Sequence, residues 1–154
     1  MIKLVLKNKK IYSEKELKKL KKSLEYLEYI LNSNLFKEKV LIQRFKDSGG
    51  LSCDEIYNKI THNYTKDKKT VIEVTLDIYK VSGTLINSVK YSQKSILKTY
   101  LFKHIFKYLN KEKIASILIH NLAHKIGFTH KGIFSRTRKY SVPYSLEKIV
   151  YKFQ

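Results

Sequence analysis

The sequence is poor in the residues that cross-link or bend a chain. It has one cysteine, one proline and five glycines among 154 residues. The lone Cys53 excludes an intramolecular disulfide, so nothing indicates an oxidising compartment. No run reaches the roughly 18 apolar residues of a membrane span, and the apolar run at the start is too short for a signal peptide. We therefore expect a soluble chain without a membrane span or signal peptide, in the cytoplasm or in a virus particle.

Arginine is also scarce, although the chain is strongly basic. The formal net charge is +19, yet Arg44, Arg136 and Arg138 are the only arginines. A basic surface attracts nucleic acid or another acidic surface, but guanidinium groups clamp phosphates better than ammonium groups do. Abundant asparagine, isoleucine, tyrosine and phenylalanine are typical of translation from an AT-rich genome. Two interpretations of the charge stay open, a functional basic face and a solvated lysine surface.

No internal repeat, low-complexity linker or Pro/Gly-rich boundary divides the chain, so we expect a single domain over residues 1–154. Capping boxes and apolar residues at three- and four-residue steps predict helices over 13–31, from Ser52 onward, over 110–126 and over 145–153. Alternation and β-prone composition predict strands over 40–45, over 70–79 and within 83–91. The order predicts an α+β fold with helices on a small sheet.

Three histidines near the C-terminus have the spacing of metal ligands. His120 and His124 lie four residues apart on the helix predicted over 110–126, so both imidazoles leave one face. Gly127 then allows a sharp turn that brings His130 back as a third nitrogen ligand. Three neutral histidines leave one coordination position open, which is the layout of a catalytic zinc site. We therefore predict that Zn²⁺ binds to these three side chains.

The segment His120–His130, HNLAHKIGFTH, resembles the metzincin signature HExxHxxGxxH. The SVPY sequence at 141–144 is similar to the turn that lies below the metal in that family. This resemblance implies a metzincin-like or zincin-like fold. Its small mixed twisted sheet would carry an N-terminal helix, an active-site helix and a C-terminal helix. It also implies that Tyr144 is a fifth ligand or an oxyanion donor, and packing of Tyr144 beneath the metal is the alternative.

The signature is broken at its catalytic position. Metzincins have a glutamate there as general base, whereas this chain has Asn121, whose amide cannot accept a proton from water. Glu112 is too far along the helix to replace it easily, and Glu73 or Asp77 could do so only from a sheet edge. The sequence therefore predicts a degenerate zinc metallopeptidase, inactive or weakly active.

Two other functions stay open at this point. The first is a structural or binding component, for example of a virus particle, that keeps the peptidase fold and contacts a peptide or protein. The second is a basic domain that binds nucleic acid through its lysines.

Overall fold

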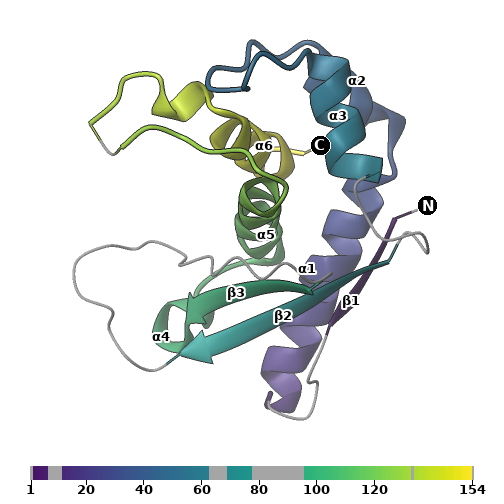
Figure 1. Cartoon of the computed structure of the whole chain (residues 1–154). Helices are drawn as coiled ribbons and strands as arrows, with labels where there is room; N and C mark the ends of the chain where they lie inside the picture. The colour runs from purple at the N-terminus through teal and green to yellow at the C-terminus, as the bar shows by residue number, and fades with distance from the viewer. Residues whose placement is uncertain (1, 7–11, 63–68, 78–95, 133, 154) are drawn as a thin grey trace.

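The computed structural model describes residues 2–6, 12–62, 69–77, 96–132 and 134–153 (Figure 1). The elements follow one another in the order β1 (Lys3–Leu6), α1 (Glu14–Leu31), α2 (Asn34–Leu41), α3 (Cys53–His62), β2 (Lys69–Asp77), β3 (Ile96–Phe102), α4 (Lys103–Phe106), α5 (Lys111–Lys125), η2 (Arg138–Tyr140) and α6 (Val142–Tyr151). The strands predicted within 83–91 lie outside the described residues.

The described strands form one sheet in the order β1-β2-β3, and both pairs are parallel. Val5 pairs with Val71, and Val71 in turn pairs with Ile96. A parallel pair needs a long crossover connection, which helices α1 to α3 provide between β1 and β2. The strand predicted over 70–79 is confirmed over 70–77, as part of β2, and its last two residues lie outside the described residues.

Helix α5 lies at the centre of the molecule, between the sheet and helix α6 (Figure 1). It packs against α1, α6 and β3. Every residue from Ile114 to Ala123 is buried, so this helix has no solvent-facing side over ten residues. A helix buried all round is held by neighbours on every side. The metal-ligand motif therefore begins on the most enclosed element of the described fold.

Two capping boxes predicted from the sequence are confirmed. The Ser13 hydroxyl accepts a hydrogen bond from the Glu16 amide, and the Glu16 carboxylate accepts one from the Ser13 amide. Ser52 and Glu55 form the same reciprocal pair at the start of α3. Each box satisfies amides that have no partner in the first helical turn, which is why these two helices begin where the sequence indicates.

The strand predicted over 40–45 is wrong, because its first residues belong to helix α2. The Ser33 hydroxyl accepts a hydrogen bond from the Phe36 amide and so caps this helix. Phe36 and Val40, four residues apart, are both completely buried. Apolar side chains at that spacing share one helical face, and the capping serine completes the signal for a helix.

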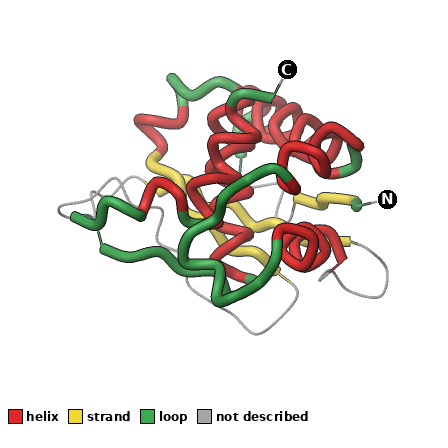
Figure 2. Tube along the Cα trace, turned by 90° about the horizontal axis from the view of Figure 1, so that it is seen from above, coloured by secondary structure: helices red, strands yellow, loops and turns green. Residues whose placement is uncertain are grey.

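The predicted α+β class with a mixed, metzincin-like sheet is also wrong. Helices make up most of the regular structure among the described residues (Figure 2), and the three described strands are parallel to one another. The sequence reasoning missed β1 and β3, and it assigned a strand to part of α2. None of the helices in the described part of the chain is long and apolar enough to cross a membrane.

Candidate metal centre

The end of helix α5 forms a Schellman motif that positions the metal-ligand candidates. The Phe128 amide donates to the Ala123 carbonyl at 3.0 Å, and the Gly127 amide donates to the His124 carbonyl at 3.0 Å. Gly127 has φ of +98°, a left-handed conformation that side chains with a Cβ rarely adopt. Buried Phe128 anchors the turn. The chain therefore reverses within three residues and carries His130 back toward the helix.

The three histidines predicted as ligands are brought together. One ligand atom from each of His120, His124 and His130 lies within 4.8 Å of the other two, so the group could hold a metal ion. The Nε2 atoms of His120 and His124 are 3.1 Å apart. Nitrogens around a tetrahedral zinc ion are separated by about 3.3 Å, given zinc–nitrogen bonds of about 2.05 Å. The third imidazole needs to approach by about 1.5 Å at most, within reach of a side-chain rotation.

Oxygen atoms hold the Nδ1 side of all three rings. Nδ1 of His124 donates to the Phe128 carbonyl at 2.8 Å, and Nδ1 of His130 donates to the Lys131 carbonyl at 3.2 Å. Because a carbonyl oxygen only accepts, Nδ1 carries the proton in both rings and Nε2 carries a lone pair. The Schellman turn supplies the Phe128 carbonyl, so the helix end selects the ligand nitrogen of His124.

Glu147 on α6 stands behind His120. Its Oε2 lies 2.9 Å from Nδ1 of His120, a contact that is an ion pair only when the ring is protonated. Its Oε1 accepts a hydrogen bond from Nζ of Lys113 at 2.8 Å. Burial pushes the Glu147 pKa upward, but the contacts with His120 and Lys113 outweigh burial and leave the pKa below its ordinary value. A carboxylate here orients His120 and raises its basicity as a ligand.

The surroundings keep two of the histidines neutral. The pKa of His124 is lowered to about 4, chiefly by burial and to a lesser extent by the neighbouring His120 and His130, against the opposing effect of the Phe128 carbonyl. Burial also lowers the pKa of His130, and the positive charge of Arg138 adds to this effect. Neutral imidazole is the form that binds metal ions, so both rings are in their ligand form at neutral pH.

Tyr144, which the sequence analysis considered as a ligand, an oxyanion donor or a packing residue, lies beside the histidines. Its ring centroid is 4.7 Å from that of His120 and 5.0 Å from that of His130. The guanidinium carbon of Arg138 lies 4.9 Å from the centroid of the same ring. Tyr144 is therefore within contact distance of two ligand candidates and is itself covered by a cation.

The SVPY sequence forms the first turn of helix α6, not a separate turn. Ser141 is the N-cap residue, and Pro143 lies in the first turn, where its missing amide hydrogen costs no hydrogen bond. The Ser141 hydroxyl donates to the Arg138 carbonyl at 2.7 Å. This helix start orients both Tyr144 and Glu147, which are three residues apart and therefore on one face.

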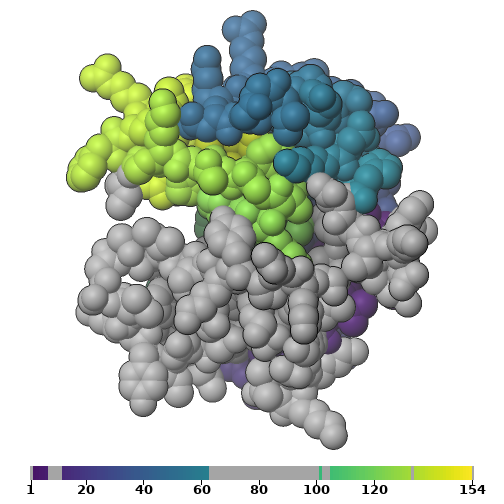
Figure 3. Space-filling view, viewed as in Figure 1, coloured from purple at the N-terminus to yellow at the C-terminus, as the bar shows by residue number. Residues whose placement is uncertain are grey.

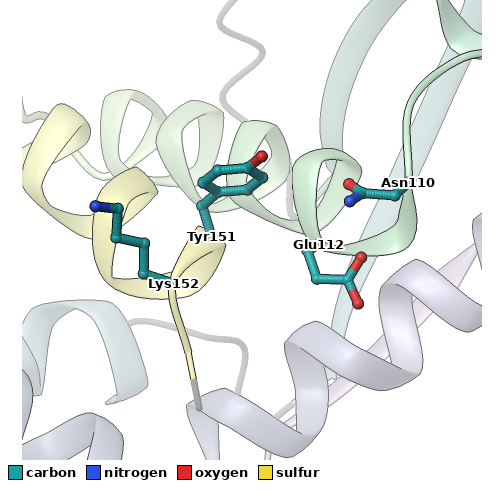
Figure 4. Close-up of a pocket in the computed structure, with 4 residues that line it drawn as sticks. All are labelled: Asn110, Glu112, Tyr151 and Lys152. Carbon is teal, nitrogen blue, oxygen red and sulfur yellow. The ribbon is translucent and has the colours of Figure 1, made fainter.

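Asn121, the residue after His120, is completely buried. Glu112, considered from the sequence as a substitute base, lies at the far end of α5. There it lines a surface pocket with Asn110, Tyr151 and Lys152 (Figure 4). None of the three histidines lines this pocket. Glu73 and Asp77, the other two substitutes considered from the sequence, belong to β2, where the structure describes the backbone but not the side chains.

No family model, no curated protein and no solved structure matches this chain. What the structure shows is a group of three histidines, delivered by one helix and the turn after it, that could hold a metal ion.

The sequence reasoning missed Glu147. One signal was available, since Glu147 is the only acidic residue after Glu112 in a strongly basic chain. That signal could not say which basic or imidazole group the carboxylate faces. The contact depends on the packing of α6 against α5, which brings Glu147 opposite His120 and Lys113.

We expect Glu147→Gln to weaken zinc binding by about 10- to 100-fold, because an amide orients His120 less firmly and does not raise its basicity. Titration with zinc against a competing chelator measures the change. Glu112→Gln removes the same charge at the other end of α5 and is expected to leave the affinity unaltered. Equal affinities of the Glu147→Gln and Glu112→Gln variants would contradict a role for Glu147 at the centre.

The metal-free protein is expected to lose stability as the pH falls from 7 to 5. An unfolded histidine takes up a proton near its ordinary pKa of about 6.5, whereas folded His124 does so only near its pKa of about 4. The unfolded state therefore binds more protons across this range. Urea unfolding in chelator at several pH values measures the slope. A His124→Gln variant should have a flatter slope, and an unchanged slope would contradict the lowered pKa.

Proposed function

We propose that this protein binds a zinc ion through His120, His124 and His130. The observation that carries the proposal is the approach of the His120 and His124 Nε2 atoms to 3.1 Å. In His124 the Nδ1 proton is held by a carbonyl, and in His120 the Nδ1 side faces a carboxylate. With the His120 proton on Nδ1, opposite that carboxylate, two nitrogen lone pairs face one another, an arrangement that repels unless a cation or proton lies between them.

The donor set fits zinc better than the harder divalent metals. Neutral imidazole is a preferred zinc ligand, whereas magnesium and calcium take oxygen ligands. Three histidines leave a coordination position for water or substrate, and a bound zinc ion supplies Lewis-acid activation of that molecule. The His120–Glu147 contact is the kind of outer contact that zinc-binding histidines make.

We infer further that the protein is a degenerate metallopeptidase with weak or no proteolytic activity. The HxxxHxxGxxH spacing, with the glycine in its left-handed turn, supports the hydrolase part of this inference. Asn121 supports the degenerate part, since its amide cannot act as the general base. Tyr144, whose ring lies beside that of His130, and Arg138, which lies over the Tyr144 ring, are the groups we infer would polarise a carbonyl oxygen at this centre.

Zinc content and hydrolysis are measured on one preparation to test this function. The expected result is one zinc ion per chain, lost on His124→Ala substitution, together with peptide hydrolysis at or near the uncatalysed rate. His62→Ala is the control, because His62 lies on α3 and its Nδ1 contacts the Thr61 hydroxyl. A chain that stays metal-free in excess zinc would overturn the proposal. Rapid zinc-dependent proteolysis by the unaltered chain would overturn only its degenerate part.

A further inference from the structure

A group of exposed basic and aromatic side chains lies next to the metal centre. We call it the basic-aromatic surface, and its members are Arg44, Lys46, Phe134, Arg136, Lys139 and Tyr140. Two chain segments far apart in sequence contribute to it. The Lys46 amide donates to the Tyr140 carbonyl at 2.8 Å, and Lys46 forms a parallel bridge with Ser141. Figure 3 shows the blue atoms of the segment after α2 adjoining the yellow-green atoms of the segment before α6.

Charge is distributed unevenly along the chain, and this surface lies on its basic side. Eleven of the 13 acidic residues precede residue 78, and only Glu112 and Glu147 follow it. Glu147 faces His120 and Lys113, so its charge is already engaged. Residues 44–47 and 134–140 contain one acid, Asp47, and five arginines and lysines. The surface therefore has a net positive charge.

Arginine separates this surface from the general excess of lysine. The chain has only three arginines, and all three lie in the two segments joined at Lys46 and Ser141. A codon bias toward lysine does not explain why the few arginines gather in one place. Guanidinium groups bind phosphate oxygens in a bidentate manner and stack on flat rings. Arg138, which covers Tyr144, connects this surface to the three histidines.

The aromatic members indicate the form of the partner. Phe134 is 100% exposed, and Tyr140 is 50% exposed with Nζ of Lys139 5.0 Å from its ring centroid. Exposed rings interleaved with cations suit unstacked bases, which stack on the rings while the phosphates meet the cations. Duplex nucleic acid hides its bases and is read by a helix or ribbon in a groove, whereas these residues lie on loops and a single 3-10 turn. An acidic protein would complement the positive charges, but it would not in general supply flat groups that stack on the exposed aromatic rings.

We propose that the basic-aromatic surface binds single-stranded nucleic acid. Its cations contact the phosphates and Phe134 stacks on a base, at the edge of the three-histidine centre. The binding needs no metal, so it is independent of the zinc proposal above.

Fluorescence anisotropy with a labelled 12-nucleotide oligothymidylate tests this, in chelator so that zinc plays no part. If about four phosphates are neutralised, the affinity should fall about 50-fold between 50 and 200 mM salt, because each contact contributes about −0.7 to the logarithmic slope. In the Arg136→Gln/Lys139→Gln double variant the fall should be only about 7-fold. The matched control, Lys18→Gln/Lys22→Gln, removes two exposed lysines from α1 and should retain the full slope.

Phe134→Ala should weaken binding about 5- to 150-fold without altering the salt slope, since stacking is not electrostatic. Tyr108→Ala removes another strongly exposed ring outside the surface and should have no effect. If Lys18→Gln/Lys22→Gln reduced the salt slope as much as Arg136→Gln/Lys139→Gln, the proposal would be overturned. Equal reductions would indicate that the oligonucleotide is attracted to the charge of the whole chain and not to this surface. Duplex DNA or polyglutamate binding as tightly as the oligonucleotide, or no effect of Phe134→Ala, would overturn it as well.

Discussion

His120→Ala should lower the melting temperature by about 8–16 °C in zinc at roughly a thousand times its dissociation constant. A ligand that binds only the folded state at that excess stabilises by about 4 kcal/mol, and each kcal/mol shifts the transition of a 154-residue chain by about 2–4 °C. The His120 ring contacts those of His124, His130 and Tyr144, so His120 is one of the three nitrogen donors of the proposed site. Thermal unfolding with and without zinc measures the difference.

The same substitution should change the melting temperature little in chelator. Removing the imidazole then relieves the opposed lone pairs of His120 and His124 and offsets part of the lost packing. His62→Ala, which removes a histidine from α3, should lose nothing in either condition. A His120→Ala variant that is equally destabilised in zinc and in chelator would mean that His120 is a packing residue and not a ligand.

Local signals made the helices largely predictable. The capping boxes at Ser13 and Ser52 and the glycine after α5 each specify a chain end through groups only a few residues apart. The sheet was much less predictable. β1 has four residues, and its pairing with β2 joins Val5 to Val71 across three helices. Strand pairing of this range leaves no periodic signal in sequence, so the parallel arrangement could not be inferred.

The metal-ligand candidates were predictable for the same local reason, since all three lie within 11 residues of helix and turn. The groups that tune them come from farther away. Glu147 and Arg138 reach the histidines only because α6 packs against α5 and because the chain before α6 folds back over Tyr144. The spacing of residues along one helix is enough to identify candidate ligands. The residues that contact those ligands from other elements depend on tertiary packing, which the spacing does not encode.

Asn121→Glu is expected to raise zinc-dependent peptide hydrolysis by about 10²–10⁴-fold over the unaltered chain, the usual contribution of a positioned general base. In the proposed centre the other groups already lie close together, since three histidines converge, Tyr144 lies beside them and Arg138 covers Tyr144. What the unaltered chain lacks is a basic group one residue after His120. Glutamate is one methylene longer than asparagine and supplies a carboxylate that accepts a proton from water. Release of a fluorescent group from a quenched peptide library measures the gain.

Asn121→Gln separates basicity from size, because it adds the same methylene but no proton acceptor. It should bind zinc as the glutamate variant does and remain as inactive as the unaltered chain. Asn121 is completely buried, so the glutamate variant should also melt earlier in chelator, where no metal compensates its charge. Combining Asn121→Glu with His124→Ala should abolish both zinc binding and the gained activity.

A glutamate variant that binds zinc, keeps its fold and still fails to hydrolyse any peptide would show that more than the general base has been lost. The centre would then be a binding site and not a degenerate catalytic one.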